Sequence, residues 1–443
     1  MKGAYIIPLR EQAKVRNSWL EERFCTILPR MMDREGFDMW IVSGREYNED
    51  PVMMSMFPQP MMSARRRTML VFYRERSHES GKEGEAGEKA LVSGEVSVES
   101  VSPESCNGLE RIAVYRGRTG LSPMYRPLWI EEEPDEWHVL SRIVEERDPK
   151  SIGINVSEVF AFGDGLSHSE YLNLMEALGP IYRERVRSAE RLALGWLETR
   201  LADEIWAYTE VVRICHDIVK EGFSRKVIVP GVTSASDVAW WMRQTMCDMG
   251  LKAWFQPSVD IQRFGVGALE PDSPILPGDL LHCDVGFYYL GLASDIQQNA
   301  YVLKLGEDSP PLGLVRALAT GNKMQDIVMG QMQAGRTGNQ ILKASLKEAE
   351  DQGIKGSVYC HPIGYHGHAA GPTIGLWDHQ EGVPGRGDYE LFEDTCHALE
   401  LNIRQEIEEW DGQEITIALE EDIVFTGNKV YFLDKRQEAF HLI

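Results

Sequence analysis

Apolar and polar positions follow two periods along this chain, and their arrangement divides it into two halves. In the first half an amphipathic helical pattern over 13–35 is followed by two buried, strand-like runs, FDMWIVSG (37–44) and RTMLVFYRE (67–75). A further strand is predicted at 151–156 and a helix at 168–178. Helices that alternate with buried strands are typical of an α/β domain.

The second half starts with a long helical run, 201–223, and we place the domain boundary just before residue 189. The chain has 443 residues, too many for one ordinary core, so we expect two domains, 1–188 and 189–443. Within the first domain, the polar and glycine-rich stretch 77–90 predicts a solvated loop or hairpin tip.

Segments 230–255 and 334–359 can be aligned with each other as an internal repeat. Each contains Gly-x-Thr, a helix of similar length, a glycine and an apolar strand. Ser234 and Asp237 have the spacing of a capping box, and Gly250 suits the position after a helix end. Either the two segments are alike by chance, or half of the domain is duplicated about a pseudo-twofold axis with a site between the halves.

Two aspartates interrupt an apolar hairpin in the second half. Asp284 and Asp295 lie in its two arms, and a turn between Tyr289 and Leu290 would set their carboxylates opposite each other. Like charges repel in that position, and a cation between them removes the conflict. Taken alone, this hairpin is equally compatible with aspartates at a solvated edge.

Two glutamates repeat this arrangement near the C-terminus. Glu400 lies in the apolar run 397–403 and Glu420 in the run 414–425, and the loop between them contains the turn dipeptide Asp411-Gly412. The two carboxylates are therefore predicted to lie nearly opposite each other. A glutamate within an apolar strand is costly unless it is paired, so two such hairpins favour a bound cation.

Three histidines fall between the acidic hairpins, within eight residues of the tract YCHPIGYHGHAAGPTIG: His361, His366 and His368. A single histidine is more often a structural hydrogen-bonding residue, but three of them next to four acids favour a metal site. Carboxylates together with imidazole suit two divalent ions of intermediate hardness, such as Mn, Fe, Co or Zn.

Composition indicates which partners, which thiol state and which cellular compartment to expect for this protein. A net charge of −23 argues against nucleic acid and against anionic membrane surfaces as partners, and no apolar run is long enough to span a membrane. Seven cysteines without a CxxC pair predict reduced thiols. The segment MKGAYIIPLREQ lacks the apolar region of a signal peptide, so we expect a cytoplasmic protein unless such a peptide has been removed.

The order and spacing of five residues resemble the metal ligands of the pita-bread metallopeptidases of family M24, in the branch of creatinase, prolidase and Xaa-Pro aminopeptidase. These residues are Asp284, Asp295, His361, Glu400 and Glu420. The tract HPIGYHGH and the segments GDLLHCDVG and LEEDIVF are also similar to family motifs. The resemblance implies a creatinase-like N-terminal α/β domain, followed by a pita-bread domain with a curved antiparallel sheet and a pseudo-twofold internal repeat.

The resemblance also implies a role for each of the five ligands. Asp284 would bind one metal ion and His361 the other. Asp295 and Glu420 would bridge the two ions. Glu400 would bind a metal ion and also act as general base toward the attacking water.

A second group of implications concerns the substrate. His368 would contact the scissile carbonyl or the tetrahedral intermediate, and His366 is a structural or substrate-binding candidate. The implied activity is hydrolysis of short peptides near their N-terminus, at Xaa-Pro bonds, by an aminopeptidase or dipeptidase. The N-terminal domain of this protein would form a homodimer or a larger homo-oligomer.

The chain departs from the family pattern at groups that read the substrate. No histidine lies between His216 and His282, although relatives usually carry one shortly before the first aspartate. Ala418 stands where proline-specific relatives commonly have Arg, and Ala369 where an acidic residue is common. The segment 369–382 resembles an insertion. We therefore expect an intact metal centre with altered substrate selection.

Two other functions stay open. One is a non-peptidase hydrolase or lyase on the same scaffold, as in creatinase, and the other is a catalytically silent module that binds peptides. Creatinase works without the metals and silent relatives have generally lost the ligands, so five intact ligand positions favour a peptidase. In the N-terminal domain, the triplet Arg65-Arg66-Arg67 precedes a strand and is a candidate for binding anions.

Overall fold

The structure is a computed structural model that describes residues 5–74, 105–116, 120–122, 124–129 and 132–443. The loop predicted at 77–90 lies outside the described residues. The chain divides into two compact units. One consists of Ala13–Trp196, and the other combines Met1–Gln12 with Leu197–Ile443.

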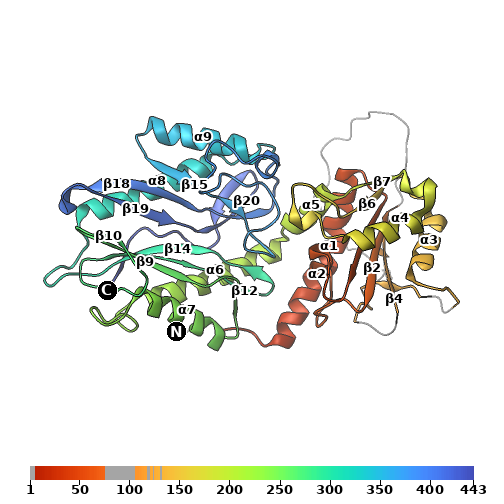
Figure 1. Cartoon of the computed structure of the whole chain (residues 1–443), viewed down its shortest axis with the longest axis horizontal. Helices are drawn as coiled ribbons and strands as arrows, with labels where there is room; N and C mark the ends of the chain where they lie inside the picture. The colour runs from red at the N-terminus through yellow and green to blue at the C-terminus, as the bar shows by residue number, and fades with distance from the viewer. Residues whose placement is uncertain (1–4, 75–104, 117–119, 123, 130–131) are drawn as a thin grey trace, which may run out of the picture. The chain divides into compact units, whose positions relative to one another are not determined.

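The unit 13–196 is a sheet with helices on both faces (Figure 1). Its strands are ordered β3 (Ser105–Cys106), β4 (Leu109–Tyr115), β2 (Arg67–Arg74), β1 (Met39–Arg45), β6 (Ile152–Ile154) and β7 (Val186–Ser188), and β5 (Arg126–Pro127) also pairs with β4. Helices α3 (Glu136–Arg147) and α4 (His168–Arg183) share one apolar core with β1, β2, β4 and β6. Helix α1 (Leu9–Glu35) packs on the sheet through Phe24, whose ring lies 5.7 Å from that of Phe72. The short helices α2 (Pro51–Ser55) and η1 (Ala161–Gly163) complete this unit.

Helix α5 (Glu190–Glu198) connects the two units. The Trp196 ring stacks on Phe24 at 5.3 Å, and the Trp196 carbonyl accepts a hydrogen bond from the Arg23 guanidinium. These contacts attach most of α5 to the first unit. The boundary that the sequence places before residue 189 therefore falls ahead of a helix that packs within this unit.

The other unit consists of two helix–sheet halves (Figure 1). The first half has α6 (Ala202–Gly222), α7 (Ala235–Asp248) and a sheet ordered β10 (Gly267–Leu269), β9 (Ser258–Arg263), β11 (Leu280–Val285), β14 (Ile296–Tyr301) and β22 (His441–Leu442). A smaller sheet contains β13 (Leu292–Ala293), β12 (Phe287–Tyr289) and β8 (Lys252–Ala253). Helix α7 packs on β9, and α6 packs on β11 and β14.

The second half has α8 (Leu312–Gln331), α9 (Gly338–Asp351) and two further sheets. One sheet is ordered β15 (Gly356–Val358), β18 (Leu401–Ile407) and β19 (Gln413–Leu419), and the other β16 (His361–Pro362), β17 (Thr395–Ala398), β20 (Asp422–Thr426) and β21 (Lys429–Phe432). The turns η2 (Arg386–Asp388) and η3 (Glu408–Trp410) lie between strands. Helix α8 packs on β18 and β19, and the sheets of the two halves adjoin where β14 contacts β19.

The two segments of the predicted repeat form corresponding elements. Helices α7 and α9 have 14 residues each, and each begins with a capping box, at Ser234 and Thr337 respectively. Glycines with positive φ follow both helices, Gly250 at 77° and Gly353 at 70°. The capping box and the glycine predicted from the sequence are therefore confirmed, and a short strand follows in each copy.

The structure bears on two further predictions, the lack of a membrane-spanning segment and the reduced state of the thiols. Among the described residues no helix is both long enough and apolar enough to cross a bilayer. The expectation of fully reduced thiols is wrong, because Cys25 on α1 and Cys106 on β3 form a disulfide with a Cα–Cα distance of 5.3 Å. The two cysteines are 81 residues apart in the sequence, and only the tertiary packing of α1 beside the sheet brings them together.

Candidate metal centre

The two aspartates of the first acidic hairpin lie on the side of the sheet nearer its turn. Asp284 is close to the end of β11, and Asp295 directly precedes β14. Leu290 and Gly291 form this turn with φ values of 55° and 83°, which suit the two central residues of a type I′ turn. The turn is therefore centred one residue later than predicted. Asp284 lies directly opposite Gln297, so the predicted register that opposes it to Asp295 is wrong. Asp295, just before β14, occupies the diagonal position on the same face, still within reach of Asp284.

The two glutamates of the second hairpin lie at the open ends of β18 and β19. Leu401 pairs with Leu419, so Glu400 and Glu420, one residue further on, lie opposite each other as predicted. Asp411 and Gly412 have the positive φ values of a turn, 51° and 79°. The register of this hairpin is confirmed.

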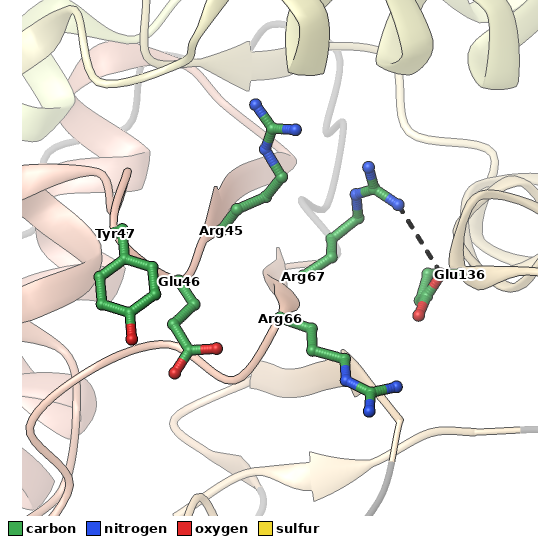
Figure 2. Close-up of a pocket in the computed structure, with 6 residues that line it drawn as sticks. All are labelled: Arg45, Glu46, Tyr47, Arg66, Arg67 and Glu136. Atoms are coloured by element: carbon green, nitrogen blue, oxygen red, sulfur yellow. Dashed lines mark ion pairs between the residues drawn. The ribbon is translucent and has the colours of Figure 1, made fainter.

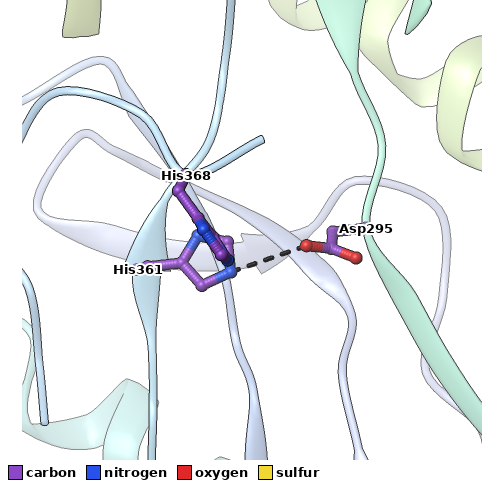
Figure 3. Close-up of side chains that lie close together, drawn as sticks. All are labelled: Asp295, His361 and His368. Carbon is purple, nitrogen blue, oxygen red and sulfur yellow. Dashed lines mark ion pairs between the residues drawn. The ribbon is translucent and has the colours of Figure 1, made fainter. Parts of the chain in front are cut away.

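His361 on β16 faces both acidic pairs. Its Nε2 atom lies 3.3 Å from Glu420 Oε1 and 3.5 Å from Asp295 Oδ2. Figure 3 shows the ring of His368 beside that of His361, and the two ring centroids are 4.6 Å apart. His361 is buried whereas His368 is exposed, so the first lies inside the centre and the second at its surface.

The five candidate ligands offer atoms that suit metal coordination. Among the described residues, three groups have ligand atoms within 4.8 Å of one another: Asp284–Asp295–Glu420, His361–Glu400–Glu420 and Asp295–His361–His368. Four buried atoms in these groups have no hydrogen-bond partner within the described part of the chain: Asp284 Oδ1, Asp295 Oδ1, His361 Nε2 and Glu420 Oε1. Buried polar atoms are normally paired, and a cation satisfies carboxylate and imidazole atoms together. The residues therefore fit divalent ions.

The electrostatics of the centre agree with this fit. Three acids have raised pKa values, first because they are buried and next because the Glu420 carboxylate lies close: Asp284, Asp295 and Glu400. Burial would lower the pKa of His361, but the neighbouring Asp295 and Glu420 raise it. A divalent ion bound here would add positive charge to this crowding of carboxylates.

His366, the third histidine of the tract, lies in none of these metal-competent groups of the described chain. Burial and then the nearby Arg200 lower its pKa to about 4. Burial, His361 and then Arg386 likewise lower the pKa of His368 to about 4. Both imidazoles are therefore neutral at physiological pH.

Two polar residues of this centre, Gln297 and His282, were not predicted from the sequence. The Gln297 amide donates to Glu400 Oε1 at 2.9 Å and to Glu420 Oε2 at 2.8 Å. His282 Nε2 lies 2.9 Å from Gln297 Oε1. The signal was present in the run IQQNAY, because consecutive amides in a buried strand are costly unless they have specific partners.

The insertion-like segment 369–382 is attached to the strand that carries His361. Ile374 and Cys360 exchange two backbone hydrogen bonds, of 2.8 and 3.1 Å. Gln380 also bonds to both the N–H and the carbonyl of Val358. This segment is therefore fixed beside the histidine tract.

A hollow of about 420 Å³ in the other unit contains part of the predicted arginine triplet (Figure 2). Its lining residues are Arg45, Glu46, Tyr47, Arg66, Arg67 and Glu136. Arg67 lies 3.8 Å from Glu136 and 3.1 Å from Glu170, which also pairs with Arg45 at 3.3 Å. Carboxylates thus offset much of the positive charge of the arginines at this hollow. Anion binding by the triplet stays a prediction.

A family model and several solved structures match this chain. The family model for metallopeptidase family M24 matches residues 207–427. The chain is similar to the X-Pro aminopeptidase from Thermotoga maritima MSB8, with a TM-score of 0.62, 16% identity, and coverage of 94% of this chain and 100% of that chain. It is also similar to the Xaa-Pro dipeptidase from Bacillus anthracis, with a TM-score of 0.56, 16% identity, and coverage of 97% and 100%.

A third similar structure is the N-terminal domain of FACT complex subunit SPT16 from Cicer arietinum, with a TM-score of 0.55, 11% identity, and coverage of 95% and 97%. No curated protein sequence gave a significant match. At these identities the likeness shows the fold. The predicted class, an N-terminal α/β domain followed by a pita-bread domain, is confirmed.

Proposed function

We propose that this chain, which belongs to metallopeptidase family M24 through residues 207–427, is a dinuclear metal-dependent peptidase acting near the N-terminus of short peptides, with Xaa-Pro bonds among its substrates. One observation carries the proposal. Buried atoms of Asp284, Asp295, His361 and Glu420 that have no hydrogen-bond partner within the described residues converge from both halves of the pita-bread unit.

The five candidate ligands divide into two groups that share Glu420. Asp284 and Asp295 form one group with it, and His361 and Glu400 form the other. Each group would hold one ion, and Asp295 and Glu420 would be the acids shared by the two ions. Divalent ions held in such a pair lower the pKa of a shared water and polarise the peptide carbonyl. Mn, Co, Zn and Fe all suit this donor set.

Protein groups then position the substrate and move the protons. Glu400 is half-buried at the open end of β18 and takes the proton of the attacking water. His368 is neutral and exposed, between the rings of Trp254 at 5.3 Å and Tyr359 at 5.8 Å. From there it donates a hydrogen bond to the substrate carbonyl as negative charge develops on that oxygen.

Substrate selection is expected to differ from that of proline-specific relatives. Ala418 lies on the same strand face as Glu420, two residues before it, and offers no charge for a substrate carboxylate. The segment 369–382, fixed beside His361, contributes other side chains to this region. Lost orienting groups weaken substrate positioning while leaving the hydrolytic step possible.

A second candidate is a catalytically silent module that binds peptides. The likeness to the N-terminal domain of a FACT complex subunit favours it at the level of the fold alone. The two candidates differ in turnover, because a silent module binds peptides without cleaving them.

A panel of peptides tests the proposal. We expect cleavage of Xaa-Pro dipeptides by Mn- or Co-loaded protein with kcat/KM below about 10⁵ M⁻¹s⁻¹, within the range of ordinary enzymes, and faster cleavage of another short peptide in the panel. Values above that limit for Xaa-Pro would show that the departures at the pocket have no effect. Binding of peptides without cleavage of any would favour the silent module.

A further inference from the structure

A buried amide, Gln297, lies directly among the candidate metal ligands. Its side chain is 5% exposed and extends from β14. The Nε2 atom donates to Glu400 Oε1 at 2.9 Å and to Glu420 Oε2 at 2.8 Å. One amide group therefore holds one oxygen of each glutamate.

The chemistry of these partners fixes which way the amide points. A carboxylate that binds a metal ion is ionised and only accepts hydrogen bonds, so the NH₂ group of Gln297 must then face the two glutamates. Its carbonyl then faces His282, whose Nε2 donates across 2.9 Å. Both N–H groups and the carbonyl are thereby used, and the side chain has a single satisfied orientation.

The register of the sheet builds a longer chain of contacts behind the amide. Asp260 on β9 pairs directly with His282 on β11, and its Oδ2 lies 3.2 Å from His282 Nδ1. His282 in turn lies diagonally from Gln297, since its direct partner is Asn299. Three neighbouring strands thus present Asp260, His282 and Gln297 in a row that ends at the two glutamates.

The amide leaves the remaining Glu420 oxygen available for an ion. Glu420 Oε1 is buried without a hydrogen-bond partner and lies 3.3 Å from His361 Nε2. A leucine would fill the same space as Gln297 without a buried polar group to satisfy. What an amide adds is control over the orientation of both carboxylates.

We propose that Gln297, held by His282, is a positioning residue that sets the metal affinity of the group formed by His361, Glu400 and Glu420. This inference rests on the proposed function, since it requires that these residues bind an ion. Residues that hydrogen-bond to metal ligands typically change metal affinity by about 10- to 100-fold when they are replaced.

Calorimetric titration of the metal-stripped, full-length protein with Mn²⁺ tests the inference without measuring activity. We expect two bound ions in the wild-type protein. In Gln297→Leu the affinity of one of them should fall by about 10- to 100-fold. The matched control is Gln298→Leu, which removes the adjacent buried amide, one that bonds to Glu421 instead, and should leave both affinities within about twofold. If Gln297→Leu does not fold, Gln297→Asn, too short to reach both glutamates, replaces it.

A double variant separates positioning from a general loss of packing. His282 acts through Gln297, so His282→Leu should weaken the same ion, and adding it to Gln297→Leu should cause little further loss. Additive losses, an unchanged affinity in Gln297→Leu, or an equal loss in Gln298→Leu would each overturn the inference. A wild-type protein that binds no Mn²⁺ would instead contradict the proposed function on which the inference rests.

Discussion

Gln297 and Glu420 join the two halves of the pita-bread unit. Their backbones exchange hydrogen bonds of 3.0 and 3.1 Å, and the Gln297 side chain donates to the Glu420 carboxylate. The candidate metal centre therefore lies on the seam between the halves. Each half supplies candidate ligands, and the geometry of the centre depends on how the halves pair.

Replacement of the shared acids should remove metal from both groups. Glu420 belongs to both ligand groups, and Asp295, a member of the first, also lies 3.5 Å from His361 Nε2 in the second. We expect Asp295→Asn or Glu420→Gln to lose most bound metal and nearly all hydrolysis, and Asp284→Asn to empty mainly one site. Elemental analysis of the purified variants measures this. Two ions retained by the Asp295→Asn/Glu420→Gln double variant would refute the ligand assignment.

The two histidines of the site should separate binding from turnover. His361 is buried between acids, whereas His368 is exposed beside it. His361→Ala should therefore lower metal content. His368→Ala should keep the metal and lower kcat by about 10²- to 10⁴-fold, the usual contribution of such groups. Equal metal loss in both variants would mean that His368 is a ligand as well.

A buried histidine outside the metal centre should make stability depend on pH. His216 on α6 bonds to Glu421 and Asp434, both at 2.7 Å. Burial would lower the pKa of His216, but the two acids raise it to about 9. A raised pKa in the folded state means that the protonated form stabilises the fold. This contribution is complete below about pH 6.5 and is lost as the pH rises through 9.

Urea unfolding at pH 6 and pH 10 measures this effect. The shift in pKa corresponds to about 3 kcal/mol of unfolding free energy. His216→Gln should be less stable at pH 6 and should lose this part of the pH dependence. The same loss of stability between pH 6 and 10 in the variant and the wild type would show that His216 does not cause it.

The disulfide should be detectable by counting thiols. The chain has seven cysteines, and Cys25 and Cys106 are paired. Denatured, unreduced protein should therefore show five reactive thiols. Closing a loop of this length stabilises a fold by about 4 kcal/mol in the chain-entropy model, so Cys25→Ser should lower the urea midpoint, whereas exposed Cys247→Ser should not. Seven reactive thiols in the unreduced protein would contradict the pairing.

Local patterns explain why much of the fold could be predicted from the sequence. The capping box at Ser234 and the turn at Asp411-Gly412 depend on residues close together in the chain. The turn of the first acidic hairpin was predicted one residue too early, because the sequence allows a turn centre at either of two neighbouring positions. Only the positive φ of Leu290 beside Gly291 decides between them.

Contacts between distant segments could not be predicted in the same way. The pairing of Cys25 with Cys106 depends on how α1 packs beside the sheet. Gln297 meets Glu400 and Glu420 only because the two halves join at this point. Sequence spacing indicated the candidate metal ligands, but the side chains that hydrogen-bond to them became visible only in the folded structure.

The most direct test of the account is the rate of peptide hydrolysis by chelator-treated protein as Mn²⁺ is added back. Because the ligands form two groups that share Glu420, we predict no turnover without metal and a rate that rises until two ions are bound per chain. A rate that is already maximal in the metal-free protein would contradict the account.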